Sequence, residues 1–280
     1  MRRSSLRVKI SAIAFAALSG AVPPCSKAAT DPRAVPGTEA HVYRHLSPIP
    51  VRLYVFKPQG WKSGDSRPAL IWFFGSGGSP RNSAAWAAWA AGLGFVGVAP
   101  DYRVSARFHM TSLESVADAR AALRWVEDHA AELGVDSHRI VTGGNSAGGF
   151  LALWTAISHA PPGSAEDESP TIKPAAMILT SPMTVAPPER FGDDARALSP
   201  LHQLDDQMPA LLVFHGNADK GASYANSVAL CARFAATGNV SRLITIPGGS
   251  HNYAGDNPAW WPRTLAIGLD FLKKQGLIPN

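Results

Sequence analysis

The chain has 280 residues, of which 46% are hydrophobic, 9% aromatic and 17% charged. This composition is ample for a packed core and excludes a mostly disordered chain. The formal net charge is +5, but residues 1–28 hold five basic and no acidic side chains, so the remainder carries 21 basic against 21 acidic residues. A neutral body without a basic stripe argues against nucleic acid as a partner.

The N-terminus has the pattern of a secretory signal peptide. Four basic residues precede a small, apolar run from Ile10 to Val22, which is too short to span a bilayer unaided. Ser26-Lys27-Ala28 then places small residues at the two positions that a signal peptidase reads. We therefore expect residues 1–28 to be a signal peptide and residues 29–280 to form one exported domain.

The cysteine count agrees with a domain that is stabilised by packing. Cys25 would leave with the signal peptide, so Cys231 has no partner for an internal disulfide. No segment after residue 28 is long and apolar enough for a stable membrane span.

Apolar runs bounded by glycine and proline predict a series of strands. They cover residues 41–46, 51–57, 69–74, 95–99, 139–142, 175–180, 210–214 and 242–246. Helices are predicted over residues 83–93, 111–133, 147–157, 223–236 and 261–274. Thr111 and Glu114 form a candidate capping box, whereas residues 158–174 and 181–209 show no clear periodicity. The order predicts an α/β domain with a mostly parallel sheet covered by helices on both faces.

A nucleophile motif lies between a predicted strand and a predicted helix. Gly144-Asn145-Ser146-Ala147-Gly148 matches G-x-S-x-G, in which a tight turn lifts the serine hydroxyl above the sheet edge. Glycines are needed at both ends because side chains there would collide with neighbouring backbone. The turn also places the amide of Ala147 at a helix N-terminus, where it can stabilise an oxyanion.

A catalytic serine needs a histidine base and an acid that orients it. In this type of fold the partners follow the serine in the order acid, then histidine, on loops after later strands. Asp219 follows the strand 210–214, and His251 follows the strand 242–246. We therefore predict Asp219 as the acid and His251 as the base for Ser146.

Other acids and one histidine compete for these roles. Asp205 and Asp206 precede their strand and should lie at its wrong end, while Asp256 comes after the histidine and breaks the order. His215 lies at a strand end and is the serious rival of His251. A histidine just before the acid loop is more often a structural hydrogen-bonding group, so we predict that role for His215.

A glycine-rich turn, residues 75–78, follows the strand 69–74 and could supply a second oxyanion donor. Metal and cofactor sites are not expected. His41 and His45 fall on a predicted strand, where their spacing does not form a helical ligand pair, and the glycine turn lacks the residues of a phosphate loop. Trp86, Trp89, Trp260 and Trp261 could floor a sugar or aromatic pocket, although core packing is the commoner role.

From about residue 50 to 275 the sequence resembles an α/β-hydrolase with a minimal cap, similar to hormone-sensitive-lipase-like esterases and bacterial feruloyl and acetyl-xylan esterases. The resemblance rests on Phe74–Gly78, Asp101–Arg103, Gly144–Gly149, His215–Asp219 and Gly249–His251. It implies Ser146 as nucleophile, Asp219 as acid and His251 as base.

The oxyanion segment departs from the commonest pattern of these esterases, His-Gly-Gly-Gly. Phe74 replaces the histidine and Ser76 one of the glycines. Matching the pattern implies the amides of Ser76 and Gly77 as donors together with Ala147. A shift of the turn by one residue would instead use Gly77 and Gly78.

The predicted function is serine-dependent hydrolysis of a carboxylic ester without a cofactor, on short-chain acyl esters or acyl groups carried by a polysaccharide. Two alternatives stay open. One is an exported exopeptidase of the prolyl-oligopeptidase type, although the chain has no room for the usual extra domain. The other is a non-catalytic binding protein on the same fold.

Overall fold

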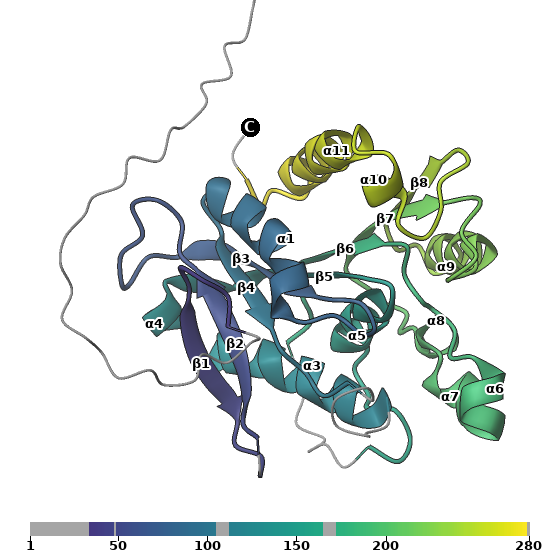
Figure 1. The fold of residues 1–280 in the computed structure, drawn as a ribbon, viewed down its shortest axis with the longest axis horizontal. Helices are drawn as coiled ribbons and strands as arrows, with labels where there is room; N and C mark the ends of the chain where they lie inside the picture. Colours follow the sequence, from purple (N-terminus) through teal and green to yellow (C-terminus); the bar gives the residue numbers. More distant parts are fainter. Residues whose placement is uncertain (1–33, 48, 105–111, 165–171, 279–280) are drawn as a thin grey trace, which may run out of the picture. The chain divides into compact units, whose positions relative to one another are not determined.

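The computed structural model describes residues 34–47, 49–104, 112–164 and 172–278 of the protein (Figure 1). The predicted signal peptide, residues 1–28, lies outside these ranges. So do Cys25 and Thr111 of the candidate capping box.

One eight-stranded sheet forms the centre of the domain. Its strands are β1 (Glu39–Arg44), β2 (Val51–Phe56), β3 (Arg67–Phe73), β4 (Val96–Pro100), β5 (Val135–Asn145), β6 (Ala176–Thr180), β7 (Ala210–Gly216) and β8 (Ser241–Ile246). The spatial order is β1-β2-β4-β3-β5-β6-β7-β8. The pairs β1–β2 and β2–β4 are antiparallel, and every pair from β4 to β8 is parallel. The prediction of a mostly parallel sheet is therefore confirmed.

Helices cover both faces of this sheet (Figure 1). The long helices are α1 (Pro80–Gly92), α3 (Ser112–Asp128), α5 (Ala147–Ala156), α9 (Tyr224–Ala236) and α11 (Trp260–Lys274). Side chains of successive strand residues point to opposite faces. Leu70 and Trp72 of β3 thus join the core under α1 and α11, whereas Ile71 and Phe73 join the core under α3, α5 and α9.

Some elements differ from the sequence prediction at their ends. Helix α1 begins at Pro80, three residues early, because Ser79 precedes a proline at the first helical position and its amide donates to the Asn82 side chain at 2.9 Å. The predicted helix 111–133 is interrupted at His129 (φ −104°, ψ 17°), which separates α3 from α4 (Ala130–Leu133). Gly134 then ends α4 in a left-handed conformation.

The segment between β6 and β7 holds more regular structure than its sequence indicates. It forms α6 (Pro188–Phe191), the 3-10 helix η1 (Gly192–Asp194), α7 (Ala195–Leu198) and α8 (Pro200–Gln203). Gly192, with φ 54°, ends α6, and the extended Ser199 before Pro200 ends α7, so these helices stay short. Helix α8 contacts α5 and α9.

Within the part of the chain that the structure describes, Cys231 of α9 is a free, half-buried cysteine. None of the helices in the described ranges is long and apolar enough to cross a membrane.

Candidate active site

Ser146 forms the sharp corner between β5 and α5. Its backbone has φ 54° and ψ −120°, a region that residues other than glycine rarely adopt. Its amide donates to Thr180 O at 3.1 Å, and its carbonyl accepts from Met183 N at 3.0 Å. These bonds tie the corner to the end of β6, so a strained conformation is held in place beside the carboxyl edge of the sheet.

The glycines around Ser146 are required by close backbone packing. A Cβ on Gly144 would lie 2.4 Å from the carbonyl of Gly148, and a Cβ on Gly148 would lie 2.1 Å from Phe73 O. Both distances are far below ordinary van der Waals contact. The sequence argument that side chains at these positions would collide is therefore confirmed.

Asp219 and His251 meet as expected from their places after β7 and β8. The distance between Asp219 Oδ2 and His251 Nδ1 is 2.8 Å. The Asp219 side chain is completely buried, whereas that of His251 is 36% exposed. The imidazole lies against Gly221, where a Cβ would come within 2.9 Å of His251 Cγ. A buried carboxylate thus orients a histidine whose other nitrogen is available to the site.

The Asp219 carboxylate is kept ionised by its hydrogen bonds. Burial alone would raise its pKa, but donation from the Ala222 amide, from His251 and from the Gly221 amide outweighs burial, and the pKa is lowered. The amide bonds to Oδ1 measure 2.9 Å from Ala222 and 2.6 Å from Gly221. Asp219 can therefore present a negative charge to His251 throughout the neutral range.

The competing acids lie elsewhere. Asp205 accepts from Lys173 Nζ at 2.7 Å and from Ser158 Oγ at 2.7 Å, and Asp206 is exposed before β7. Asp256, in the short helix α10 (Tyr253–Asp256), hydrogen-bonds Ser250 Oγ and so braces the loop that carries His251.

The glycine-rich turn after β3 lies directly against the serine. A Cβ on Gly75 would be 3.3 Å from Ser146 Cβ. The Gly78 amide donates to Gly75 O at 3.1 Å, and Gly77 has φ 73°, which closes a tight turn. Among the described residues, no hydrogen bond engages the amides of Ser76 or Gly77. Because the Gly78 amide is already occupied, the geometry favours the Ser76 and Gly77 register.

Tyr102 anchors this turn, a role that no pattern in the sequence predicts. Its hydroxyl donates to Phe74 O at 2.5 Å, and its ring stacks on Phe74 with centroids 4.2 Å apart. The motif Asp101-Tyr102-Arg103 was part of the family resemblance, but nothing in its composition indicates which backbone atom it reaches.

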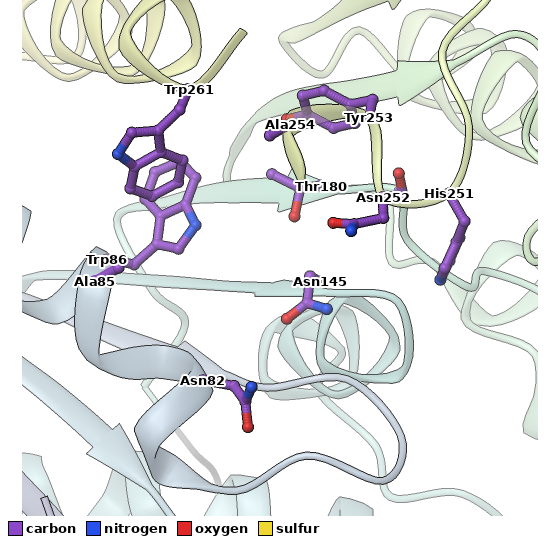
Figure 2. Close-up of a pocket in the computed structure, with 11 residues that line it drawn as sticks. Asn82, Ala85, Trp86, Asn145, Thr180, His251, Asn252, Tyr253, Ala254 and Trp261 are labelled. Carbon is purple, nitrogen blue, oxygen red and sulfur yellow. The ribbon is translucent and has the colours of Figure 1, made fainter. Parts of the chain in front are cut away.

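A cavity of about 250 Å³ opens beside the histidine (Figure 2). Its walls include Asn145, which precedes Ser146, and Thr180, which bonds the Ser146 amide. Trp86 and Trp261 lie together on the side opposite His251, with ring centroids 5.4 Å apart in an edge-on arrangement (Figure 2). His251 and Asn145, the residue before Ser146, thus line the same cavity.

The comparisons with known proteins point to esterases. A family model described as BD-FAE matches residues 53–168. The esterase Est2 of Thermogutta terrifontis, solved with propionate bound, is 34% identical with a TM-score of 0.81, over 88% of this chain and 97% of that chain. The chain belongs to the α/β-hydrolase esterases.

Curated relatives match this chain over shorter segments. The carboxylesterase NlhH of Mycobacterium tuberculosis is 35% identical over 116 residues, which are 39% of this chain and 34% of the relative. The secreted triacylglycerol lipase LIP1 of Gibberella zeae is 32% identical over 115 residues, 35% of this chain and 20% of the relative. The matched segments thus span about a third of the length of NlhH and about a fifth of the length of LIP1.

Several side chains around the esterase site had no sequence signal of their own. Asn82, Asn145 and Asn252 add amide groups to the cavity, and Ser181 adds a buried residue with φ 42°. They come from four separate segments of the chain. Only the tertiary structure brings them together, because single asparagines and serines are common in every loop. Within the described ranges, no cluster of histidine, cysteine and acidic side chains could hold a metal ion.

Proposed function

We propose that this protein hydrolyses carboxylic esters through Ser146, His251 and Asp219. The observation that carries the proposal is the hydrogen bond between buried Asp219 and His251, which lines one cavity together with Asn145, the residue before the strained Ser146 corner, within an esterase fold. His251 accepts the proton of Ser146 as the hydroxyl attacks the ester carbonyl, and then donates that proton to the departing oxygen, which leaves as the alcohol. Water then cleaves the acyl-enzyme with His251 again as base.

The oxyanion is held by amides that converge on the serine. Ala147 supplies the amide at the start of α5, and Ser76 and Gly77 supply those of the turn after β3. Backbone donors fixed in advance stabilise the charge that develops in the transition state without reorganising. Two observations support these donors. A Cβ on Gly75 would lie only 3.3 Å from Ser146 Cβ, and the Gly78 amide already donates to Gly75 O.

The substrates we propose are short-chain acyl esters, including acyl groups on a polysaccharide. The indoles of Trp86 and Trp261 close the cavity away from His251, which limits the length of a bound chain. The amides of Asn82, Asn145 and Asn252 offer hydrogen bonds to a hydroxylated substrate (Figure 2). Est2 of Thermogutta terrifontis has also been solved with butyrate bound, which supports short acyl groups.

A panel of esters from acetyl to decanoyl, with feruloyl, tests this proposal. We expect kcat/KM to be highest between acetyl and butyryl and at least about tenfold lower for decanoyl, because added methylenes gain nothing once the pocket is full. Trp261→Ala should remove part of the wall and raise kcat/KM for long chains relative to acetyl.

Two results would contradict the proposal. Faster cleavage of aminoacyl-arylamides than of aryl esters would favour the exopeptidase alternative. Absence of turnover on every ester, together with absence of any serine labelling, would favour the non-catalytic alternative.

We also propose that the protein is exported, from the signal-like pattern of residues 1–28. Secreted material should then begin near Ala29 or Thr30 and have a net charge near zero. Intact-mass measurement of protein recovered outside the cytoplasm checks this expectation. A retained Met1, or a lipid on Cys25, would contradict it.

A further inference from the structure

His215 is buried in β7 with every ring nitrogen engaged. Its side chain is fully inaccessible to solvent. The distance from Nε2 to Asp219 Oδ2 is 3.0 Å and that to Ala222 O is 3.2 Å. Nδ1 lies 2.7 Å from the hydroxyl oxygen of Ser227, which is also buried.

The chemistry of these partners fixes the tautomer of His215. A carboxylate and a carbonyl oxygen can only accept, so Nε2 must carry the proton. In the neutral ring Nδ1 is then an acceptor, and the Ser227 hydroxyl donates to it. Ser227 can do so from α9 because its side chain faces β7.

His215 completes the set of donors around Asp219. Oδ1 accepts from the amides of Gly221 and Ala222, and Oδ2 accepts from His251 and His215. With two donors on each oxygen the carboxylate has no freedom to rotate. Removing His215 would leave Oδ2 held by His251 alone, the group that Asp219 has to orient.

We propose that His215 is a positioning residue, which holds Asp219 as a neutral Nε2–H donor, while the hydroxyl of Ser227 donates to its Nδ1. The inference rests on the proposed function, since it concerns the acid of that site. Sequence reasoning assigned His215 a structural role. The structure shows that its hydrogen-bond partner is the acid itself.

The surroundings keep His215 neutral. Among the described residues, the titratable groups that face it are Asp219 after β7, His251 after β8 and Tyr224 of α9. The ring centroids of Tyr224 and His215 are 5.8 Å apart in an edge-on arrangement. Burial lowers the pKa of His215 and outweighs the charge of Asp219, which acts in the opposite direction. His215 therefore acts on Asp219 as an uncharged donor at neutral pH.

The experiment compares His215→Phe, His215→Gln and Ser227→Ala with the parent protein. Ser83→Ala is the matched control, because Ser83 is likewise a fully buried helical serine, but its hydroxyl has no hydrogen-bond partner among the residues that the structure describes. Ser227→Ala removes a single oxygen atom and therefore tests the proposal even where His215→Phe fails to fold. For each variant we would measure kcat and KM with an aryl acetate, the pH profile, the thermal melt and nitrogen-15 NMR of the histidine rings.

We expect kcat to fall about tenfold in His215→Phe, with KM within about twofold, as for the loss of one hydrogen bond to a charged group. The acid limb of the profile should move to higher pH, because a carboxylate with fewer donors stabilises the protonated base more strongly. His215→Gln retains a neutral donor and should recover part of kcat. In Ser227→Ala the nitrogen spectrum should keep the proton of His215 on Nε2, because both partners of that nitrogen can only accept, while the Nδ1 resonance shifts and kcat falls less than in His215→Phe.

Lowered melting temperatures with unchanged kcat and pH profile in His215→Phe and Ser227→Ala would overturn the proposal, since a merely structural role predicts that pattern. A parent spectrum with the proton on Nδ1 of His215 would also overturn it. The NMR readout does not depend on turnover. A protein that cleaves no ester but carries the His215 proton on Nε2 would refute the proposed function and leave the hydrogen-bond arrangement standing. The two failures can therefore be told apart.

Discussion

Ser146→Ala should lower kcat for aryl ester hydrolysis by about 10³-fold or more, because removal of the nucleophile disables the whole catalytic unit. The melting temperature should change little. Alanine carries a Cβ as serine does and is no more strained at φ 54°, and the Ser146 hydroxyl is not among the hydrogen bonds that tie the corner to β6.

A fluorophosphonate probe gives an independent measurement. The parent protein should be labelled on Ser146, and the label should be absent from Ser146→Ala and retained in the control Ser83→Ala. Est2 of Thermogutta terrifontis has been solved phosphonylated by sarin, so a related esterase reacts with this class of reagent. Labelling at another residue, or labelling that survives the substitution, would contradict the assignment.

His251→Ala should approach the defect of Ser146→Ala, because loss of the base removes proton transfer from both halves of the reaction. Asp219→Asn should lower kcat by about 10³–10⁴-fold. The imidazole stays in place in that variant, but an amide at position 219 can present its NH₂ group to Nδ1 and so favour the wrong tautomer. Turnover and thermal melts of the purified variants check both expectations.

Asp206→Asn is the matched control for the acid. Asp206 is exposed and precedes β7, so it lies at the opposite end of that strand from the loop that carries Asp219. The change should therefore leave kcat unaltered. If Asp206→Asn were inactive while Asp219→Asn kept full turnover, the assignment of the acid would be wrong. The pKa of Asp219 is lowered, so the acid limb of the activity profile should not report its titration.

The fold followed from local pattern. Continuous apolar runs such as Leu70 to Phe73 are typical of strands buried on both faces, and their alternation with helices leaves few topologies other than a parallel sheet. The residues Ser146, Asp219 and His251 were singled out for the same reason. In a parallel sheet, the ends of successive strands must meet at one edge, so position along the chain indicates position in space.

Element boundaries were less predictable where a tertiary contact decides them. Strand β5 extends back to Val135 because that residue pairs with Arg67, far along the chain. The turns between β6 and β7 have little periodicity of their own, and α8 is held by packing on α5 and α9. No local signal encodes such contacts.

The sequence by itself determined an α/β domain with a mostly parallel sheet, since hydrophobic period is a property of the chain, and strand-end position indicated the candidates for nucleophile, acid and base. The α/β-hydrolase fold was implied by the resemblance of its motifs to those of esterases. Only the tertiary structure decided which amides of the turn after β3 are unoccupied, and that Asp219 lies between two histidines rather than one. It also decided that Trp86 and Trp261 line the cavity together on the side opposite His251 (Figure 2). Each of these depends on directional contacts between segments far apart in sequence, and residue type alone carries no record of them.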